Sequence, residues 1–400
     1  MKNTLLLIFI TVLGASGQGG YNFISGKIID KSTQKAISGS YISIPNRGVG
    51  TTTNINGEFK FYYPRINTDS SVVISQLGYK NFVKKASAFD STNVIELEPA
   101  EFQPAVTALD AKTIVKNAIE KIKENFNSTP NYQTGFYLET TEMEKVGFVQ
   151  IKEGVLRIER QTGTKAEIME KVKLLRSRKY EWPGQLSKID GFGLANGTAF
   201  VTRSLENGVP EFLEKGNLGD YNFTVDSLMN SYNNQPVYSI SFSPVSKRIK
   251  AARNGKIYID QYTEAIVRIE YEFTPEGIKD VIKSSIMSNT KKEGKSVKAY
   301  TQFTILNGKW QLQQSQISFV TDFEGKLDNK YKSTATLNFF FVVNESFKLG
   351  PRSAIKDDEI LLTTENFPKA GLYEDKVWGT TNYIIPTEEM REIVKKSLKK

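Results

Sequence analysis

Two carboxylates on one predicted strand have the spacing that comes closest to a known chemistry. Glu270 and Glu272 stand two residues apart in the segment Ile266–Phe273, so their side chains share one face of a strand at about 7 Å. Glycoside hydrolases use two carboxyl groups about 5 to 9.5 Å apart, one as acid and one as base or nucleophile. Arg268 lies on the same face, and its charge favours surface ion pairing over catalysis.

Two residue types that carry much of enzyme chemistry are absent from the chain. None of its 400 residues is a histidine or a cysteine. This excludes Ser-His-Asp and Cys-His nucleophilic machinery and the usual zinc sites, and leaves carboxylate, Ser/Lys or Tyr chemistry. We predict no catalytic residue, no cofactor-binding residue, no metal ligand and no bound cofactor, and we expect that the protein is not an enzyme.

Other polar or aromatic residues have structural explanations. Asp260 and the pair Asn54 and Asn56 precede turns, where Asp and Asn bond to their own backbone; calcium would need more carboxylates. The run Gly191–Gly197 lacks the preceding strand, following helix and Lys-Ser/Thr of a phosphate loop. Of the tryptophans, Trp182 stands in a loop-like region and Trp310 at a predicted strand start. We favour packing over sugar stacking for the tryptophans, which include Trp378.

The first residues have the pattern of an export signal. Lys2 precedes the apolar run Leu5–Leu13, and small residues follow up to Gly17, so we predict a signal peptide over residues 1–17 with cleavage between Gly17 and Gln18. The run is too short for a bilayer span of about 20 residues. We therefore expect an exported protein of the periplasm or associated with the outer membrane, and the absence of cysteine means no disulfides.

The charge of the chain is basic but dispersed. It has 53 Lys and Arg against 44 Asp and Glu, a net charge of +9. No predicted element interleaves basic and aromatic residues as a nucleic-acid-binding face does, so we expect no nucleic-acid partner. A solvated basic surface is the favoured interpretation, and weak peripheral attraction to anionic lipid or lipopolysaccharide stays open.

The segment Ser25–Tyr79 alternates short strands with turn residues, which is typical of a small β-sandwich. Phe59, Phe61 and Tyr63 share one face of a strand, and Gly57 and Gly78 stand in the turns. The order of elements resembles the carboxypeptidase regulatory-like domain of secreted proteins from Bacteroidetes-type bacteria. The resemblance implies a transthyretin-like β-sandwich over residues 21–99 that serves as an accessory module. It is carried by Gly26, Asp30, Thr33, Ala36, Ile37, Gly39, Gly48, Gly50, Thr51, Thr53, Gly57, Phe59, Ser75, Gly78 and Tyr79.

A helix and a second β region follow the sandwich. Apolar residues recur every three or four positions in Asp110–Phe126, which predicts one amphipathic helix within a linker over residues 100–130. We expect Ile114, Ala118, Ile119 and Ile122 to face the sheet that follows, and an aspartate at Ile119 to be strongly destabilising. Alternation in Ile266–Phe273 and Thr334–Val343 predicts an antiparallel sheet with one dry face over residues 131–350. The region Tyr180–Asp226 is predicted to leave this sheet, and residues 351–400 to form a C-terminal segment with a terminal helix.

Two further resemblances concern this second region. The helix leading to Gly135-Phe136-Tyr137 is similar to the start of a family of exported Bacteroidetes proteins that carry the same regulatory-like domain, although Leu138 stands where an arginine is usual. The strands from Gly255 to Phe273 are similar to the curved sheet of periplasmic lipoprotein-carrier proteins. Neither resemblance brings a known active site.

The sequence thus predicts a mainly β protein: a transthyretin-like β-sandwich and a larger curved antiparallel sheet domain with one packed helix. The favoured function is a non-catalytic envelope protein that binds a partner protein, glycan or lipid. A periplasmic lipid or lipoprotein carrier and a carboxylate-dependent glycan-active enzyme are the alternatives. A dry cavity would favour the carrier, and a solvent-lined cleft with two carboxylates and exposed aromatic residues would favour the enzyme.

Overall fold

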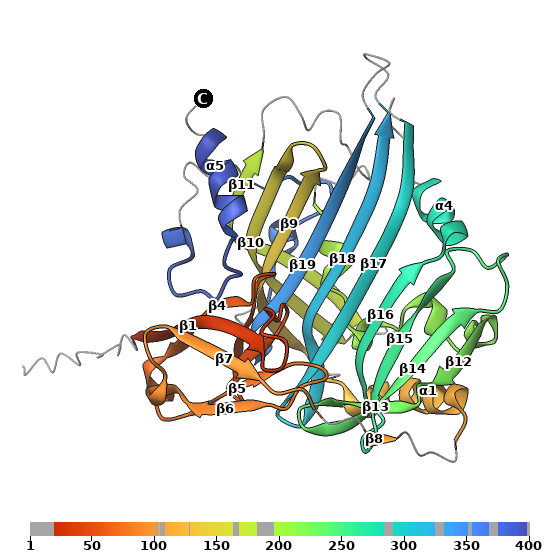
Figure 1. The fold of residues 1–400 in the computed structure, drawn as a ribbon, viewed down its shortest axis with the longest axis horizontal. Helices are drawn as coiled ribbons and strands as arrows, with labels where there is room; N and C mark the ends of the chain where they lie inside the picture. The colour runs from red at the N-terminus through yellow and green to blue at the C-terminus, as the bar shows by residue number, and fades with distance from the viewer. Residues whose placement is uncertain are drawn as a thin grey trace, which may run out of the picture.

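The computed structural model confirms a mainly β protein with a sandwich and a large curved antiparallel sheet (Figure 1). Five α-helices lie in the described part of the chain, where the sequence predicted one packed helix and a terminal one. The structure describes residues 20–100, 103–104, 109–127, 129–162, 168–181, 196–283, 291–324, 332–350, 354–367 and 375–397.

The N-terminal sandwich consists of two sheets around an apolar core. One sheet has the order β4-β1-β7 and the other contains β6-β5-β2-β3. Phe59, Phe61, Val72 and Ile74 are at most 1 % exposed between them, as the alternation of apolar residues predicted. Its strands are β1 Tyr21–Asp30, β2 Tyr41–Ile44, β3 Val49–Thr52, β4 Glu58–Pro64, β5 Ser71–Ser75, β6 Phe82–Lys85 and β7 Asn93–Leu97, with 3-10 turns η1 Arg65–Asn67 and η2 Ala86–Ala88.

The large sheet runs β11-β10-β9-β19-β18-β17-β16-β15-β14, and both β12 and β13 pair with β14. All its ladders are antiparallel, and it is joined to the sandwich by pairing of Glu345 with Val49 of β3. Its strands are β9 Asn131–Met143, β10 Gly147–Thr162, β11 Ile168–Glu181, β12 Tyr221–Val225, β13 Leu228–Tyr232, β14 Gln235–Pro244, β15 Arg253–Asp260, β16 Ile266–Phe273, β17 Lys291–Leu306, β18 Lys309–Glu324 and β19 Lys332–Lys348; the short β8, Gln103–Pro104, pairs with β13.

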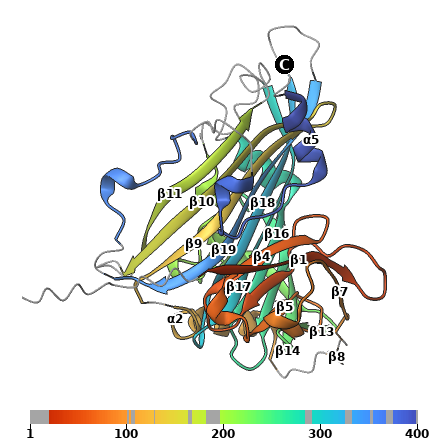
Figure 2. The same cartoon turned by 90° about the vertical axis from the view of Figure 1, so that its left-hand side faces the viewer.

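The sheet has one dry face, here called the inner face, defined by Val267, Ile269, Phe339 and Phe341. Arg268 and Glu270 point to the opposite, outer face, as the period-two pattern of β16 predicted. The outer face carries the sandwich beside β19 and, beside β10, the helix α5, Glu388–Ser397, of the C-terminal segment (Figure 2). Tyr41 of the sandwich packs there with Phe136, Val342 and Trp378.

Helical segments cover part of the inner face, while α5 and the 3-10 turn η8, Asp375–Trp378, pack on the outer face. Asp110 caps α1, Ala111–Glu120, by accepting the N–H of Thr113. The helix predicted within Asp110–Phe126 is interrupted at Lys121. Ile114, Val115 and Ala118 are buried in the core of the inner face. There α1 lies beside β12 and β15 of the large sheet. The other elements are α2 Ile122–Asn125, α3 Thr198–Val201, α4 Pro275–Lys283 and α5 Glu388–Ser397, with 3-10 turns η4 Leu205–Asn207, η5 Glu211–Leu213, η6 Leu218–Asp220, η7 Asp357–Glu359 and η8 Asp375–Trp378.

The predicted excursion Tyr180–Asp226 needs correction at both ends. Tyr180 belongs to β11, and Tyr221–Val225 forms β12. Between them, the described residues 196–220 form α3 and three 3-10 turns on the inner face. The weak periodicity of this stretch is explained by turns that bury single apolar residues such as Leu205 and Phe212, and this gives neither a strand nor a helix pattern.

Candidate functional site

A groove of about 970 Å³ opens on the inner face beside β11. The α1–α2 segment forms one wall, β11 forms the floor, and the segments around η4 and Leu361 complete it. Ile119, Val172, Val209 and Leu361 line it and are half-buried, so part of their apolar surface borders the groove. This volume lies within the range of about 300–1,000 Å³ of small-molecule sites.

A buried guanidinium lies beneath the groove, next to the lining residues Glu170, Glu206 and Asn207. Arg160 is 1 % exposed and lies on the same side of β10 as Leu156 and Ile158. It donates from Nε to Asn207 Oδ1 (3.1 Å), from Nη2 to the Thr202 carbonyl oxygen (2.8 Å), and from Nη1 to the Gln133 side chain. Arg160 therefore fixes the segment around η4 to the sheet.

Two carboxylates of the groove lining lie near this arginine. Glu170 Oε2 is 3.7 Å and Glu206 Oε1 is 3.8 Å from Arg160 Nε, so both are ion-paired beyond normal hydrogen-bond length. The Glu206 side chain is 3 % exposed. Its burial raises the pKa of Glu206, although the Arg160 charge and the Ser204 hydroxyl act in the opposite direction.

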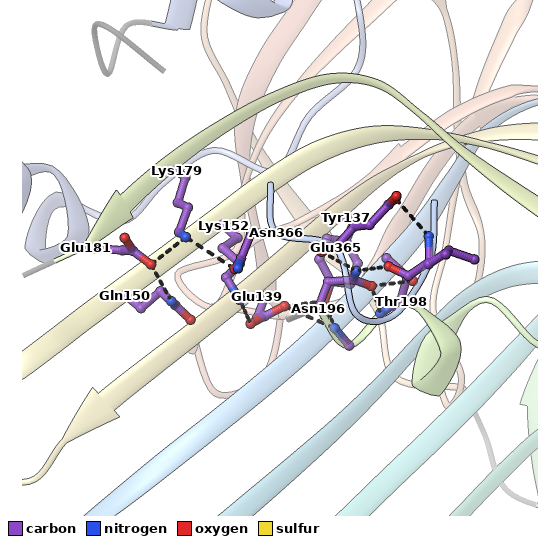
Figure 3. Close-up of polar contacts among 12 residues, drawn as sticks. Tyr137, Glu139, Gln150, Lys152, Lys179, Glu181, Asn196, Thr198, Glu365 and Asn366 are labelled. Carbon is purple, nitrogen blue, oxygen red and sulfur yellow. Dashed lines mark hydrogen bonds and ion pairs between the residues drawn. The ribbon is translucent and has the colours of Figure 1, made fainter. Parts of the chain in front are cut away.

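A row of polar side chains crosses the inner face next to the groove (Figure 3). Its centre is a buried ion pair: Lys152 Nζ donates to Glu139 Oε1 at 2.6 Å, and the two side chains are 5 % and 7 % exposed. The Tyr137 hydroxyl donates to Glu139 Oε2 at 2.6 Å. Burial, with the neighbouring Glu139 charge, raises the pKa of Tyr137 well above its usual value, so this hydroxyl stays a donor.

The same row holds two backbone segments over β9 and β10, one at Asn196–Gly197 and one at Leu362–Glu365. The Gly197 N–H donates to Tyr137 Oη (2.9 Å) and Glu139 Oε2 (3.2 Å). A side chain at Gly197 would meet the Phe339 ring at 2.1 Å, so only glycine allows this approach. Asn196 donates to the carbonyl oxygens of Leu362 (2.9 Å) and Glu365 (2.8 Å). Because Lys152 and Glu139 satisfy one another's charge, this row positions backbone segments, and the adjoining groove is the open part of the site.

The predicted glutamate pair lies elsewhere, on the outer face. Tyr258 Oη (2.8 Å) and Arg268 Nε (3.0 Å) both donate to Glu270. Glu272 accepts from Ser296 Oγ at 3.0 Å and lies 3.4 Å from Lys298 Nζ. The two glutamates border a shallow depression of about 580 Å³. Their local partners confirm the prediction of surface charge pairing.

The turn predictions are also confirmed by direct contacts. Asp260 Oδ1 accepts the backbone N–H of Thr263 (2.7 Å), and Asn54 Oδ1 accepts that of Asn56 (2.9 Å). Gly57 and Gly78 have φ of +75° and +88°, which side chains rarely adopt. Trp310 is buried at the start of β18 and Trp378 is fully buried. The signal cleavage residues Gly17 and Gln18, Trp182 and residues 191–195 of the glycine-rich run lie outside the described residues.

Sequence analysis missed the charged residues of the inner face, which include Arg160, Glu206, Glu139 and Lys152. One signal was present: in the strand-like segment Val155–Arg160, the arginine stands in phase with Leu156 and Ile158, hence on the same face as these apolar residues. A charge in phase with core residues predicts a buried, paired group. No group of three or more side chains that could hold a metal ion is found in the part of the chain that the structure describes.

The protein is a β-sandwich joined to a curved antiparallel sheet, whose inner face carries helical segments and a groove. Residues 24–106 match the CarboxypepD_reg-like domain family, which confirms the predicted resemblance for the sandwich. The match does not extend to the large sheet. No curated protein matches this chain.

Solved structures show only distant likeness. A DUF1329 family protein from Desulfovibrio piger aligns over 59 % of this chain and 94 % of its own at 10 % identity, with a TM-score of 0.24. MucB, solved in complex with MucA(peri), aligns over 58 % and 93 % at 9 % identity, with a TM-score of 0.21. Both TM-scores are below 0.5, too low to relate the function of this chain to either protein. No described helix has the length and apolar character to cross a membrane.

Proposed function

We propose that this protein is an exported, non-catalytic protein of the cell envelope that binds an amphiphilic, lipid-like ligand in the inner-face groove. One observation carries the proposal: half-buried apolar side chains line a groove of about 970 Å³. Apolar surface bordering such a volume gains free energy when a ligand removes it from water. The proposal corresponds to the lipid carrier that the sequence left as an alternative, with the groove as its ligand site.

Two features favour a lipid-like ligand over a glycan or peptide. Sugar recognition commonly uses exposed aromatic faces, and the one aromatic residue among the described lining residues, Phe126, is 1 % exposed. The apolar wall residues Ile119, Val172, Val209 and Leu361 surround the groove on several sides, which suits a flexible chain better than a flat peptide surface.

The proposal of a non-catalytic role rests on the carboxylates of the groove. Glu170 and Glu206 flank a buried arginine that is held by three neutral acceptors. Both carboxylates are charge partners of one arginine, and the chain has no histidine, the commonest general base. Export is proposed from the Lys2, Leu5–Leu13 and Gly17 pattern, and the CarboxypepD_reg-like match suits an accessory module beside a binding domain.

The groove can be tested by filling it. Val209→Trp places a large side chain in the groove from the segment after η4, and we expect it to weaken binding of the uncharged fluorescent probe N-phenyl-1-naphthylamine at least tenfold, or about 1.4 kcal/mol. Leu361→Trp, from another wall, should act alike. Val94→Trp, at a site that is 69 % exposed on the sandwich, is the matched control.

Fluorescence titration measures the affinities, and thermal melts establish that each variant is folded. Wild-type affinity in both folded groove variants would place the probe elsewhere and reject the groove. Absence of probe binding to the wild-type protein would reject the proposed function directly.

A further inference from the structure

The arginine beneath the groove has more hydrogen-bond partners than the two carboxylates beside it. Arg160 directs its hydrogen bonds to Asn207, Thr202 and Gln133, all neutral acceptors. Its two acidic neighbours, Glu170 and Glu206, stay at 3.7 and 3.8 Å, where attraction is present but a hydrogen bond is not. The guanidinium therefore neutralises one negative charge without supplying a donor to either carboxylate.

The carboxylates have spare acceptor capacity as a result. Glu170 Oε2 is buried and accepts no hydrogen bond in the described structure. Glu206 accepts from the Ser204 hydroxyl, although a carboxylate offers about four acceptor positions. A buried acceptor without a donor is unfavourable, so a donor that reaches these oxygens from the groove gains more here than at the surface.

The balance of charge inside the groove is negative. Two carboxylates face one guanidinium, which leaves one excess negative charge when both are ionised. The other charged residues of the lining, Lys123, Arg203 and Glu214, are exposed at the rim, where water and salt screen them. The charges beside the apolar wall thus complement a cation.

We infer that the groove selects amphiphiles whose head group is a primary ammonium, with Glu170 and Glu206 as its acceptors and the apolar wall as the site of the chain. This deepens the proposed function and rests on it. An ammonium carries three N–H donors on a compact positive charge, and so offers what both carboxylates lack. A carboxylate head group would add a like charge, and an alcohol would supply one donor without charge.

Competition with the fluorescent probe distinguishes these head groups. Dodecylammonium, dodecan-1-ol and dodecanoate share one chain length, and each is titrated at pH 7 and low salt, below its micelle concentration. We expect dodecylammonium to bind at least tenfold more tightly than dodecan-1-ol, and dodecanoate to bind most weakly. The test is stringent because the net charge of +9 would by itself favour the anion.

Variants assign the preference to the two carboxylates. Glu170→Gln and Glu206→Gln keep the shape of the side chain, and each should reduce dodecylammonium affinity about tenfold while dodecan-1-ol affinity stays constant. Glu211→Gln, an exposed neighbour outside the groove lining, is the control and should change neither affinity.

The outcomes separate this inference from the proposed function. If none of the three ligands binds, the proposed function fails. If they bind with equal affinity, or dodecanoate binds best, the groove is a lipid site without ammonium selection and the inference is wrong. If the ammonium preference survives in both folded glutamine variants, these carboxylates are not its acceptors and the inference is equally wrong. The wild-type ranking decides the matter even if a variant does not fold.

Discussion

The sandwich and the large sheet bury their interiors in different ways. The sandwich closes its own core between two sheets, with apolar residues such as Ile28, Phe59 and Ile74 packed between them. Among the described residues no second sheet opposes the large sheet, and helical segments and loops cover its inner face. Some of these segments are held by buried charges such as Arg160 and Lys152. A sheet that other chain segments must cover needs directional contacts to place them, because apolar contact alone is not directional.

The comparison also explains where a ligand site arises. Two sheets about 10 Å apart fill the space between them with interdigitating side chains. Turns such as η4 and η5 bury isolated residues, Leu205 and Phe212, and leave a groove beside them. Incomplete covering of the inner face is therefore the structural origin of the candidate site.

The largest effect should come from a charge within the inner-face core. Val115 of α1 is 0 % exposed, and Val115→Asp should lower the free energy of unfolding by about 4 kcal/mol or more. Val94→Asp, at an exposed sandwich position, should change it by less than about 0.5 kcal/mol. Urea denaturation measures both, and equal midpoints would show that α1 is not docked.

A corollary corrects the expectation for Ile119. The side chain is half-buried and borders the groove, so an aspartate there keeps access to water. Ile119→Asp should cost less than half as much as Val115→Asp, and a greater cost would mean that the groove is closed in solution.

Breaking the ion pair of the polar row should have the next largest effect. Lys152→Met leaves Glu139 buried with the Tyr137 hydroxyl and the Gly197 N–H as donors, and removing one partner of a buried pair costs about 3–5 kcal/mol. The double variant Glu139→Leu/Lys152→Met should recover part of this loss. Hydrogen exchange should show lost protection at residues 196–198 and unchanged protection in the sandwich; faster exchange throughout the sandwich would contradict the separation of the two cores.

A fall in pH should lower the stability contributed by Asp30 in the sandwich and raise that contributed by Glu206 in the large-sheet domain. In the sandwich, the Tyr79 hydroxyl and the Thr33 N–H hold the pKa of Asp30 below its ordinary 3.8, so this contribution to stability is present above pH 3.8 and is lost as the pH falls through the folded-state pKa. Burial raises the pKa of Glu206 above its ordinary 4.5, so its contribution is full below pH 4.5 and is lost as the pH rises through the folded-state pKa.

Two variants measure this difference. The destabilisation caused by Asp30→Asn should shrink as the pH falls below 3.8. Glu206→Gln should become more favourable, relative to the wild type, as the pH rises above 4.5. Urea midpoints across this pH range give both trends, and parallel curves for the two variants would refute the assignment of the shifts.

The sequence predicts the elements better than it predicts the site. Strong alternation defines β16, whose observed bounds equal the predicted Ile266–Phe273, and Asp110 marks the start of α1. The apolar runs Val146–Ile151 and Val155–Arg160 belong to one strand, β10, because Gly154 continues the ladder opposite Tyr137. Arg160, Glu170 and Glu206 come from β10, β11 and η4, and their meeting depends on how 3-10 turns pack, for which local periodicity gives no signal.

The contacts that join the sandwich to the large sheet have a consequence for the order of events during synthesis. Tyr41 donates to the Val343 carbonyl oxygen, the Tyr62 N–H donates to Asn382, and Asn54 donates to the Ile385 carbonyl oxygen. Each pair is separated by more than 300 residues. Since the N-terminal part of a chain emerges first and distant contacts form slowly, a sandwich that has already folded must keep this surface exposed until synthesis has passed Ile385.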